Sequence, residues 1–205
     1  MIVPLGFDCT VAISLRNVGH RTCAYPFDWV TSVDFPMVAQ IFLRVVRMSD
    51  PELELFVRSF FDFSVNTVYH QNFDGRTVFV NREHGISFPH DDVETIEEKY
   101  LRRYKRLRDD YQSADRVIVL RASIYRDETD DLIDFLAEAD DKVELVRFVA
   151  ALPELPGPSH PRMRTCSLDI PVDKVELYHN GDFAYHQTTV VEKFDVALRA
   201  VLLST

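Results

Sequence analysis

Two hydrophobic patterns alternate along this chain, and each predicts a different kind of element. Short apolar runs rich in β-branched residues, bounded by Gly, Asn, Asp or Pro, indicate buried strands. Such runs occupy residues 2–5, 67–71, 76–81, 86–90, 117–120, 143–149 and 174–178. Apolar residues spaced three or four apart indicate helices at residues 9–18, 35–61, 93–111, 127–139 and 189–203. We therefore expect an α/β fold, with a mixed or mostly parallel sheet flanked by helices, in a single domain over residues 1–205.

Capping and turn residues divide the longer stretches. Ser49 or Asp50 can cap a helix that Pro51 opens, so residues 35–61 are predicted to form two helices. Asp74 and Gly75 supply the turn of a predicted hairpin. The proline-rich segment 152–164 is expected to be an ordered loop or lid.

Aromatic residues gather where the second of these two helices ends. Four phenylalanines lie within eight residues of one another, at Phe56, Phe60, Phe61 and Phe63. Aromatic side chains at helical spacing usually pack in a core, and we interpret all four as core residues.

Composition and charge narrow the function classes. The chain has 205 residues, of which 46% are hydrophobic, and a net charge of −10, so nucleic acid and anionic membranes would repel it. Three widely spaced cysteines provide no disulfide framework and favour a reducing, cytoplasmic location. No signal peptide and no transmembrane segment is expected from the hydrophobic pattern.

The stretch "LGFDCTVAISLRNVG", residues 5–19, places a cysteine at the start of a predicted helix. Gly6 permits a tight exit from the first strand, Asp8 can cap the helix, and Gly19 suits its end. Cys9 would then lie in the first turn, where unpaired N–H groups and the helix dipole lower the pKa of a thiol. The same N–H groups can bind an oxyanion. A cysteine near a strand end can equally be a small buried hydrophobic residue.

A cysteine nucleophile needs a base, and sequence position favours one of the seven histidines. His90 ends a predicted strand, so its imidazole would reach the edge of the sheet where Cys9 emerges if the two strands run parallel. Asp91 can orient that imidazole. It can also cap the following helix, with Glu94 as its capping-box partner.

Two further polar clusters are weaker candidates for chemistry. The basic run at 99–108 can bind an anion, although its charges alternate with acidic residues on a predicted helix and fit a solvated face. His179, Asp182 and His186 lie close in sequence, but their spacing matches no zinc motif. We therefore expect neither a metal nor a cofactor.

At this point the motifs can be compared with known families. The segments "LGFDCTVAISLRNVGHRT", "YPFDW" at 25–29, "ISFPHD" at 86–91 and "EEKYLRRYKRL" occur in an order that resembles the putative papain-like cysteine peptidase family, a domain family of bacteria and large DNA viruses. The resemblance implies that Cys9 is the nucleophile and His90 the general base. It also implies that Asp28 and Trp29 belong to the site or support it.

The leading hypothesis is therefore a cysteine peptidase-like hydrolase, with Cys9, His90 and Asp91 as catalytic residues and Asp8, Asp28 and Trp29 as supporting residues. Its partner would be a protein or peptide substrate. One alternative is a thiol esterase or acyl transferase that uses the same cysteine. The other is a non-catalytic protein-binding module, in which the "PFDW" segment contributes to a groove.

Overall fold

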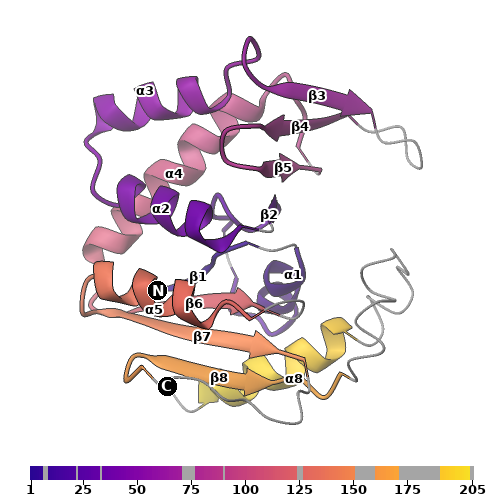
Figure 1. Cartoon of the computed structure of the whole chain (residues 1–205), viewed down its shortest axis with the longest axis vertical. Helices are drawn as coiled ribbons and strands as arrows, with labels where there is room; N and C mark the ends of the chain where they lie inside the picture. Colours follow the sequence, from indigo (N-terminus) through magenta and orange to yellow (C-terminus); the bar gives the residue numbers. More distant parts are fainter. Residues whose placement is uncertain are drawn as a thin grey trace.

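A computed structural model describes most of the chain. The described residues are 1–6, 9–21, 23–32, 34–70, 77–89, 91–123, 127–150, 160–170 and 190–203. Within them two sheets lie one above the other in the view of Figure 1, and the helix α2 lies between them in that view. The predicted strand at 174–178 falls outside the described residues.

The larger sheet contains four parallel strands in the order β1-β6-β7-β8. Their bounds are β1 Ile2–Pro4, β6 Val117–Ala122, β7 Val143–Val149 and β8 Met163–Ser167. The predicted α/β fold with a parallel sheet flanked by helices is confirmed. β8 was not predicted, because its sequence MRTCS is partly exposed and carries no apolar run.

The smaller sheet is antiparallel and has the order β2-β5-β4-β3. Its strands are β2 Thr31–Ser32, β5 Ile86–Phe88, β4 Thr77–Asn81 and β3 Thr67–His70. The predicted hairpin corresponds to the antiparallel pair β3 and β4. β2 was not predicted, since two residues are too short to show a period.

Helices cover both faces of the parallel sheet. The helices α1 (Thr10–Asn17) and α8 (Val191–Leu203) share one buried cluster with Ile118, Leu120 and Val146 of the sheet. The helices α2 (Phe35–Val45) and α5 (Thr129–Glu138) share the opposite cluster with Val119 and Leu145. Alternate residues of the strands thus face different helix layers, as the pleat requires.

Two further helices, α3 (Asp50–Phe60) and α4 (Ile96–Ser113), pack against each other beside the antiparallel sheet (Figure 1). Ser49 caps α3 in a capping box with Glu52, and Pro51 stands in the first turn, as predicted. The helix α4 begins three residues later than the expected Val93. A turn in which the carboxylate of Asp92 accepts the Glu94 N–H at 3.0 Å precedes it.

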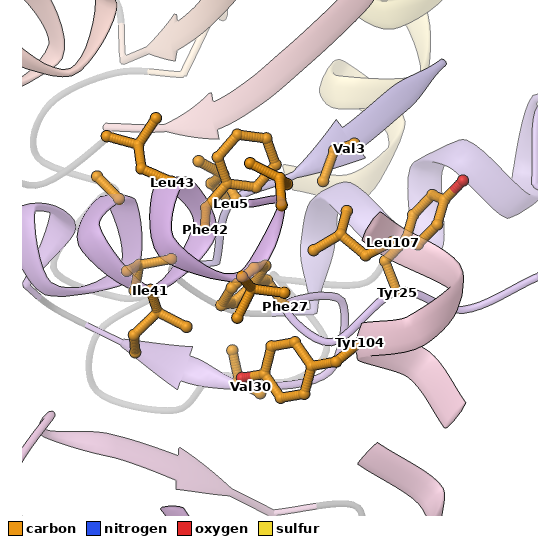
Figure 2. Packing of buried hydrophobic residues seen from close by; sticks show 14 of the residues in the cluster. Val3, Leu5, Tyr25, Phe27, Val30, Ile41, Phe42, Leu43, Tyr104 and Leu107 are labelled. Carbon is orange, nitrogen blue, oxygen red and sulfur yellow. The ribbon is translucent and has the colours of Figure 1, made fainter. Parts of the chain in front are cut away.

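One continuous buried cluster joins the two sheets. It includes Val3 and Val119 of the parallel sheet and Phe79 and Phe88 of the antiparallel sheet. Figure 2 shows Phe27 between α2 and α4 within this cluster, and its ring meets Tyr104 edge to face at a centroid distance of 6.0 Å. Hydrophobic burial therefore holds the two sheets together.

Three of the four clustered phenylalanines are core residues as predicted. Phe56, Phe60 and Phe61 are buried. Phe63 is 49% exposed, so its assignment to the core was wrong. It follows the end of α3, where the helical period no longer applies, and its ring meets the Phe79 ring edge to face at a centroid distance of 5.2 Å.

Candidate functional site

Cys9 lies where the chain passes from the parallel sheet into α1. The N–H of Leu5 still donates to the Leu120 carbonyl at 2.9 Å, one residue beyond the end of β1. Four residues later, Cys9 occupies the N-cap position of α1, and its carbonyl accepts the Ile13 N–H at 2.9 Å. Cys9 thus lies at a helix start that follows a strand, as predicted, although it occupies the N-cap position and not the first turn.

The cap itself differs from the expectation. We expected Asp8 to cap the helix, whereas the N-cap residue is Cys9, and Asp8 falls outside the described residues. Cys9 is partly buried, and its backbone already has helical angles, φ −76° and ψ −5°. The positive end of the helix dipole at this position stabilises a thiolate.

Gly6 shapes the exit from β1. Its φ of +45° is a conformation that other residues adopt only with strain. A Cβ atom added there would lie 3.6 Å from Val30 Cγ2 and 3.8 Å from Ser32 Cβ. Gly6 therefore lies against β2 and the residue before it.

The strand before His90 does not belong to the same sheet as β1. The predicted approach of His90 to Cys9 needs these two strands to run parallel, but β5 belongs to the antiparallel sheet and ends at Phe88. His90 itself falls outside the described residues. The two sheets still approach each other here, because β2 lies against Gly6 and pairs with β5 through Thr31 and Ser87. The pairing of Cys9 with His90 stays a prediction.

Asp91 is buried and held by residues of α4. Its carboxylate accepts a hydrogen bond from Tyr100 Oη at 2.7 Å and forms an ion pair with Lys99. Burial raises the pKa of Tyr100 well above its ordinary value, and the Asp91 carboxylate adds to that effect. The expected capping role of Asp91 was wrong, because the N-cap position of α4 belongs to Thr95.

Asp28 anchors the "PFDW" segment from inside. Its side chain is fully buried, accepts the Tyr25 N–H and pairs with Arg21, which follows α1. Burial lowers the pKa of Arg21 to about 10. The Tyr25 hydroxyl in turn donates to Asp110 of α4 at 2.6 Å. Asp28 thus ties the segment to the end of α1 and orders the chain beside the candidate site.

Trp29 follows Asp28 and contacts α1 from outside. It is partly buried, and the Arg16 guanidinium lies over its ring at 5.9 Å from the ring centroid. Trp29 therefore lies beside α1, the helix that begins after Cys9. The tryptophan is held to α1 by a cation–π contact as well as by packing.

A buried ionic network under the exit of β1 was not predicted. Arg121 is fully buried at the end of β6, and its Nη1 donates to the carbonyl oxygens of Leu5 at 3.0 Å and Gly6 at 2.6 Å. Glu128 accepts from Arg121 Nε at 2.9 Å and Nη2 at 2.6 Å, and from Ser123 Oγ at 2.6 Å. The signal in the sequence was an arginine that follows the apolar run "VIVL" directly.

The other polar clusters have structural partners or fall outside the described residues. In the basic run, Lys105 pairs with Glu54 and Arg108 with Asp50, so these cations join α4 to α3. His179, Asp182 and His186 lie outside the described residues. The described parts of the chain contain no group of three or more His, Cys, Asp or Glu side chains placed to bind a metal ion. Among the helices described, none has the length and apolar character that a membrane span needs.

Neither of the remaining two cysteines lies at the start of a helix. Cys23 lines a cavity of about 250 Å³ with Met1, His20 and Arg21. Cys166 lies in β8, and burial raises the pKa of its thiol. None of the three cysteines forms a disulfide bond.

A strand, a glycine with positive φ and a cysteine at a helix N-terminus thus follow one another at the candidate site. The chain belongs to the family described as "Putative papain-like cysteine peptidase (DUF1796)", which matches residues 1–148. That range includes Cys9, the "PFDW" segment, His90 and the buried network around Arg121. Comparisons with curated proteins and with solved structures gave no match.

Proposed function

We propose that this protein is a cysteine-dependent, peptidase-like hydrolase with Cys9 as its nucleophile. The observation that carries the proposal is the Cys9 thiol at the N-cap of α1, at the carboxyl end of a parallel strand. Membership of a family described as papain-like cysteine peptidases supports the same assignment. Ligand sites in parallel α/β sheets commonly lie at this edge.

The proposed reaction has two stages. The Cys9 thiolate attacks the carbonyl carbon of the scissile amide and forms a C–S bond, while N–H groups at the start of α1 stabilise the oxyanion. The C–N bond then breaks, and the leaving amine takes a proton from the His90 imidazolium. Water attacks the thioester and gives its proton to His90. The acid product leaves, and the Cys9 thiolate is regenerated.

The supporting residues have distinct proposed roles. Asp91 would orient the His90 imidazole, since the two residues are adjacent in the chain and the Asp91 carboxylate is held by Tyr100 and Lys99. Asp28 and Trp29 would hold the "PFDW" segment against α1. None of these roles requires a metal or a cofactor.

The decisive experiment measures the rate of alkylation of each cysteine against pH. Trace iodoacetamide is added between pH 4.5 and 9.5, and mass spectrometry assigns the labelled sites. We expect Cys9 to react well below the free-thiol pKa of about 8.5. Cys166 serves as the internal control, because burial raises the pKa of its thiol. Equal profiles for Cys9 and Cys166 would remove the proposal.

A second measurement separates the enzyme from the alternatives. A panel of fluorogenic peptides and acyl thioesters is offered to the protein and to the variants Cys9→Ala and Cys166→Ala. Cleavage of peptides that depends only on Cys9 supports a peptidase, whereas cleavage of thioesters alone identifies a thiol esterase. Peptide binding without cleavage, unchanged in Cys9→Ala, would identify a binding module.

A further inference from the structure

A buried arginine of β6, Arg121, binds the two backbone carbonyl groups that directly follow β1. Arg121 Nη1 reaches two successive carbonyl oxygens, those of Leu5 and Gly6. These residues stand four and three positions before Cys9. The guanidinium thus holds the backbone at the point where the chain turns from the sheet toward the thiol.

Glu128 holds the guanidinium in turn. Its two carboxylate oxygens accept from Nε and Nη2, a bidentate geometry that sets the plane of the Arg121 side chain. Ser123 donates to the same carboxylate, and the guanidinium lies over the Phe35 ring at 5.2 Å from its centroid. Arg121 and Glu128 are both almost inaccessible to solvent.

A buried ion pair is an expensive way to stabilise a fold, because apolar residues of similar volume often serve as well or better. The first four residues of β6, Val117 to Leu120, are accordingly apolar. The charged pair occurs only where β6 ends, beside the exit of β1. The position of the pair therefore indicates that it holds the backbone that follows β1 in a defined geometry.

We infer that Arg121 and Glu128 are positioning residues for the Cys9 nucleophile, and the inference rests on the proposed function. By holding the Leu5 and Gly6 carbonyls, the pair keeps Gly6 against Val30 and Ser32 and sets where the start of α1 lies relative to β2. Because β2 pairs with β5, two residues before His90, this contact also controls the alignment of Cys9 with its proposed base.

The test compares Glu128→Gln with a matched control at the other end of the same sheet. Arg116 and Glu144 form a bidentate pair with N···O distances of 2.7 Å, but the pair is partly exposed and lies at the amino end of the strands. Glu144→Gln therefore removes the same charge from the same type of pair. Both variants are compared with wild type in the full chain by the pH profile of Cys9 alkylation.

We expect Glu128→Gln to slow Cys9 alkylation at pH 6 by about tenfold, which corresponds to a rise of one unit in the thiol pKa. The rate at pH 9.5, where every accessible thiol is ionised, should stay near the wild-type value. Glu144→Gln should reproduce the wild-type profile throughout. A lower melting temperature of Glu128→Gln with an unchanged Cys9 profile would overturn the inference and leave a purely structural role.

A second variant guards against loss of the fold. Arg121→Lys keeps the buried charge but replaces the planar fork by a single ammonium group, which cannot hold Glu128 and both carbonyls in the same geometry. We expect the same loss of reactivity at pH 6 as in Glu128→Gln, and a wild-type profile for Arg121→Lys would overturn the inference. If Cys9 of the wild-type protein is not alkylated below the free-thiol pKa, the proposed function fails, and the positioning role fails with it. A reactive wild type with insensitive variants rejects the positioning role alone.

Discussion

The two sheets of this protein meet at the candidate site but are stabilised by different interactions. At the carboxyl edge of the parallel sheet, the bidentate pair of Arg121 and Glu128 is buried, and Arg147 beside it donates to Thr129 at 2.6 Å. The antiparallel sheet instead packs through aromatic rings. Phe88 meets Tyr100 at 4.9 Å and Phe61 at 5.2 Å between ring centroids.

These two kinds of interaction differ in how precisely they can position a site between the sheets. Aromatic burial scales with area and tolerates small shifts, whereas a bidentate ion pair is directional. Cys9, the candidate nucleophile, follows β1 of the parallel sheet, where the buried ion pair lies. His90, the proposed base, follows β5 of the antiparallel sheet, which packs through aromatic rings. We therefore expect the aromatic residues to determine stability and the ionic residues to determine alignment.

The largest effect should come from the aromatic core. Phe88→Ala removes a buried ring that contacts Phe61 and Tyr100, and we expect a loss of about 3–5 kcal/mol in the free energy of unfolding. Urea denaturation followed by Trp29 fluorescence and by circular dichroism measures it. For a single domain the two signals should coincide, as they should for Leu145→Ala in the parallel sheet. Separate transitions for the two sheets would show that residues 1–205 form more than one domain.

The second largest loss of stability is expected at one of the two ion pairs that lie at opposite ends of the parallel sheet. Arg121→Met leaves the Glu128 carboxylate buried without its partner, and we expect a loss of about 3 kcal/mol. Arg116→Met breaks a partly exposed pair that solvent screens, and it should cost less than about 1 kcal/mol. Chemical denaturation of both variants measures the two losses in the free energy of unfolding. Similar losses would mean that burial does not distinguish the two pairs.

A smaller effect is expected at Asp91. Tyr100→Phe removes one hydrogen bond from a buried carboxylate that keeps its ion pair with Lys99, and it should cost about 1–2 kcal/mol. If Asp91 orients His90, the same variant should also slow peptide cleavage while leaving the alkylation rate of Cys9 at pH 9.5 unchanged. Tyr111→Phe, which removes a bond to the more exposed Asp140, is the matched control. Equal rates of peptide cleavage in Tyr100→Phe and Tyr111→Phe would show that Asp91 does not orient His90.

The smallest effect concerns pH and the turn between β4 and β5. His84 stacks on Phe60 at 5.2 Å, and burial lowers the pKa of its imidazole, with Arg44 acting in the same direction and Glu83 opposing. Below its ordinary pKa of about 6.5 the unfolded chain binds the proton more readily than the folded protein, so stability falls as the pH falls.

His84→Phe keeps the stacked ring and removes the titration. Because His84 Nδ1 is buried without a hydrogen-bond partner among the described residues, the change breaks no bond at that atom. The loss of stability between pH 7 and pH 5 should therefore be smaller in His84→Phe than in wild type. Melting temperatures across this range measure the difference, and parallel curves would contradict it.

Local chemistry was enough to predict much of the framework. The glycine exit, the helix start at Cys9, the break at Pro51 and the apolar strand β6 all depend on residues close together in the chain, so the sequence alone determined them. Periodicity likewise placed the core face of α4, although α4 begins at Ile96, after the turn at Asp92.

Contacts between distant residues decided the rest. The sequence could not show that β5 joins an antiparallel sheet, that β2 and the partly exposed strand β8 exist, or that Asp91 binds Tyr100 instead of capping α4. An arginine after an apolar run was visible in the sequence, but its hold on Leu5 and Gly6 joins residues more than a hundred positions apart. Periodicity and capping record only the interactions of neighbouring residues, whereas strand pairing and buried charge pairs form only when the whole chain has folded.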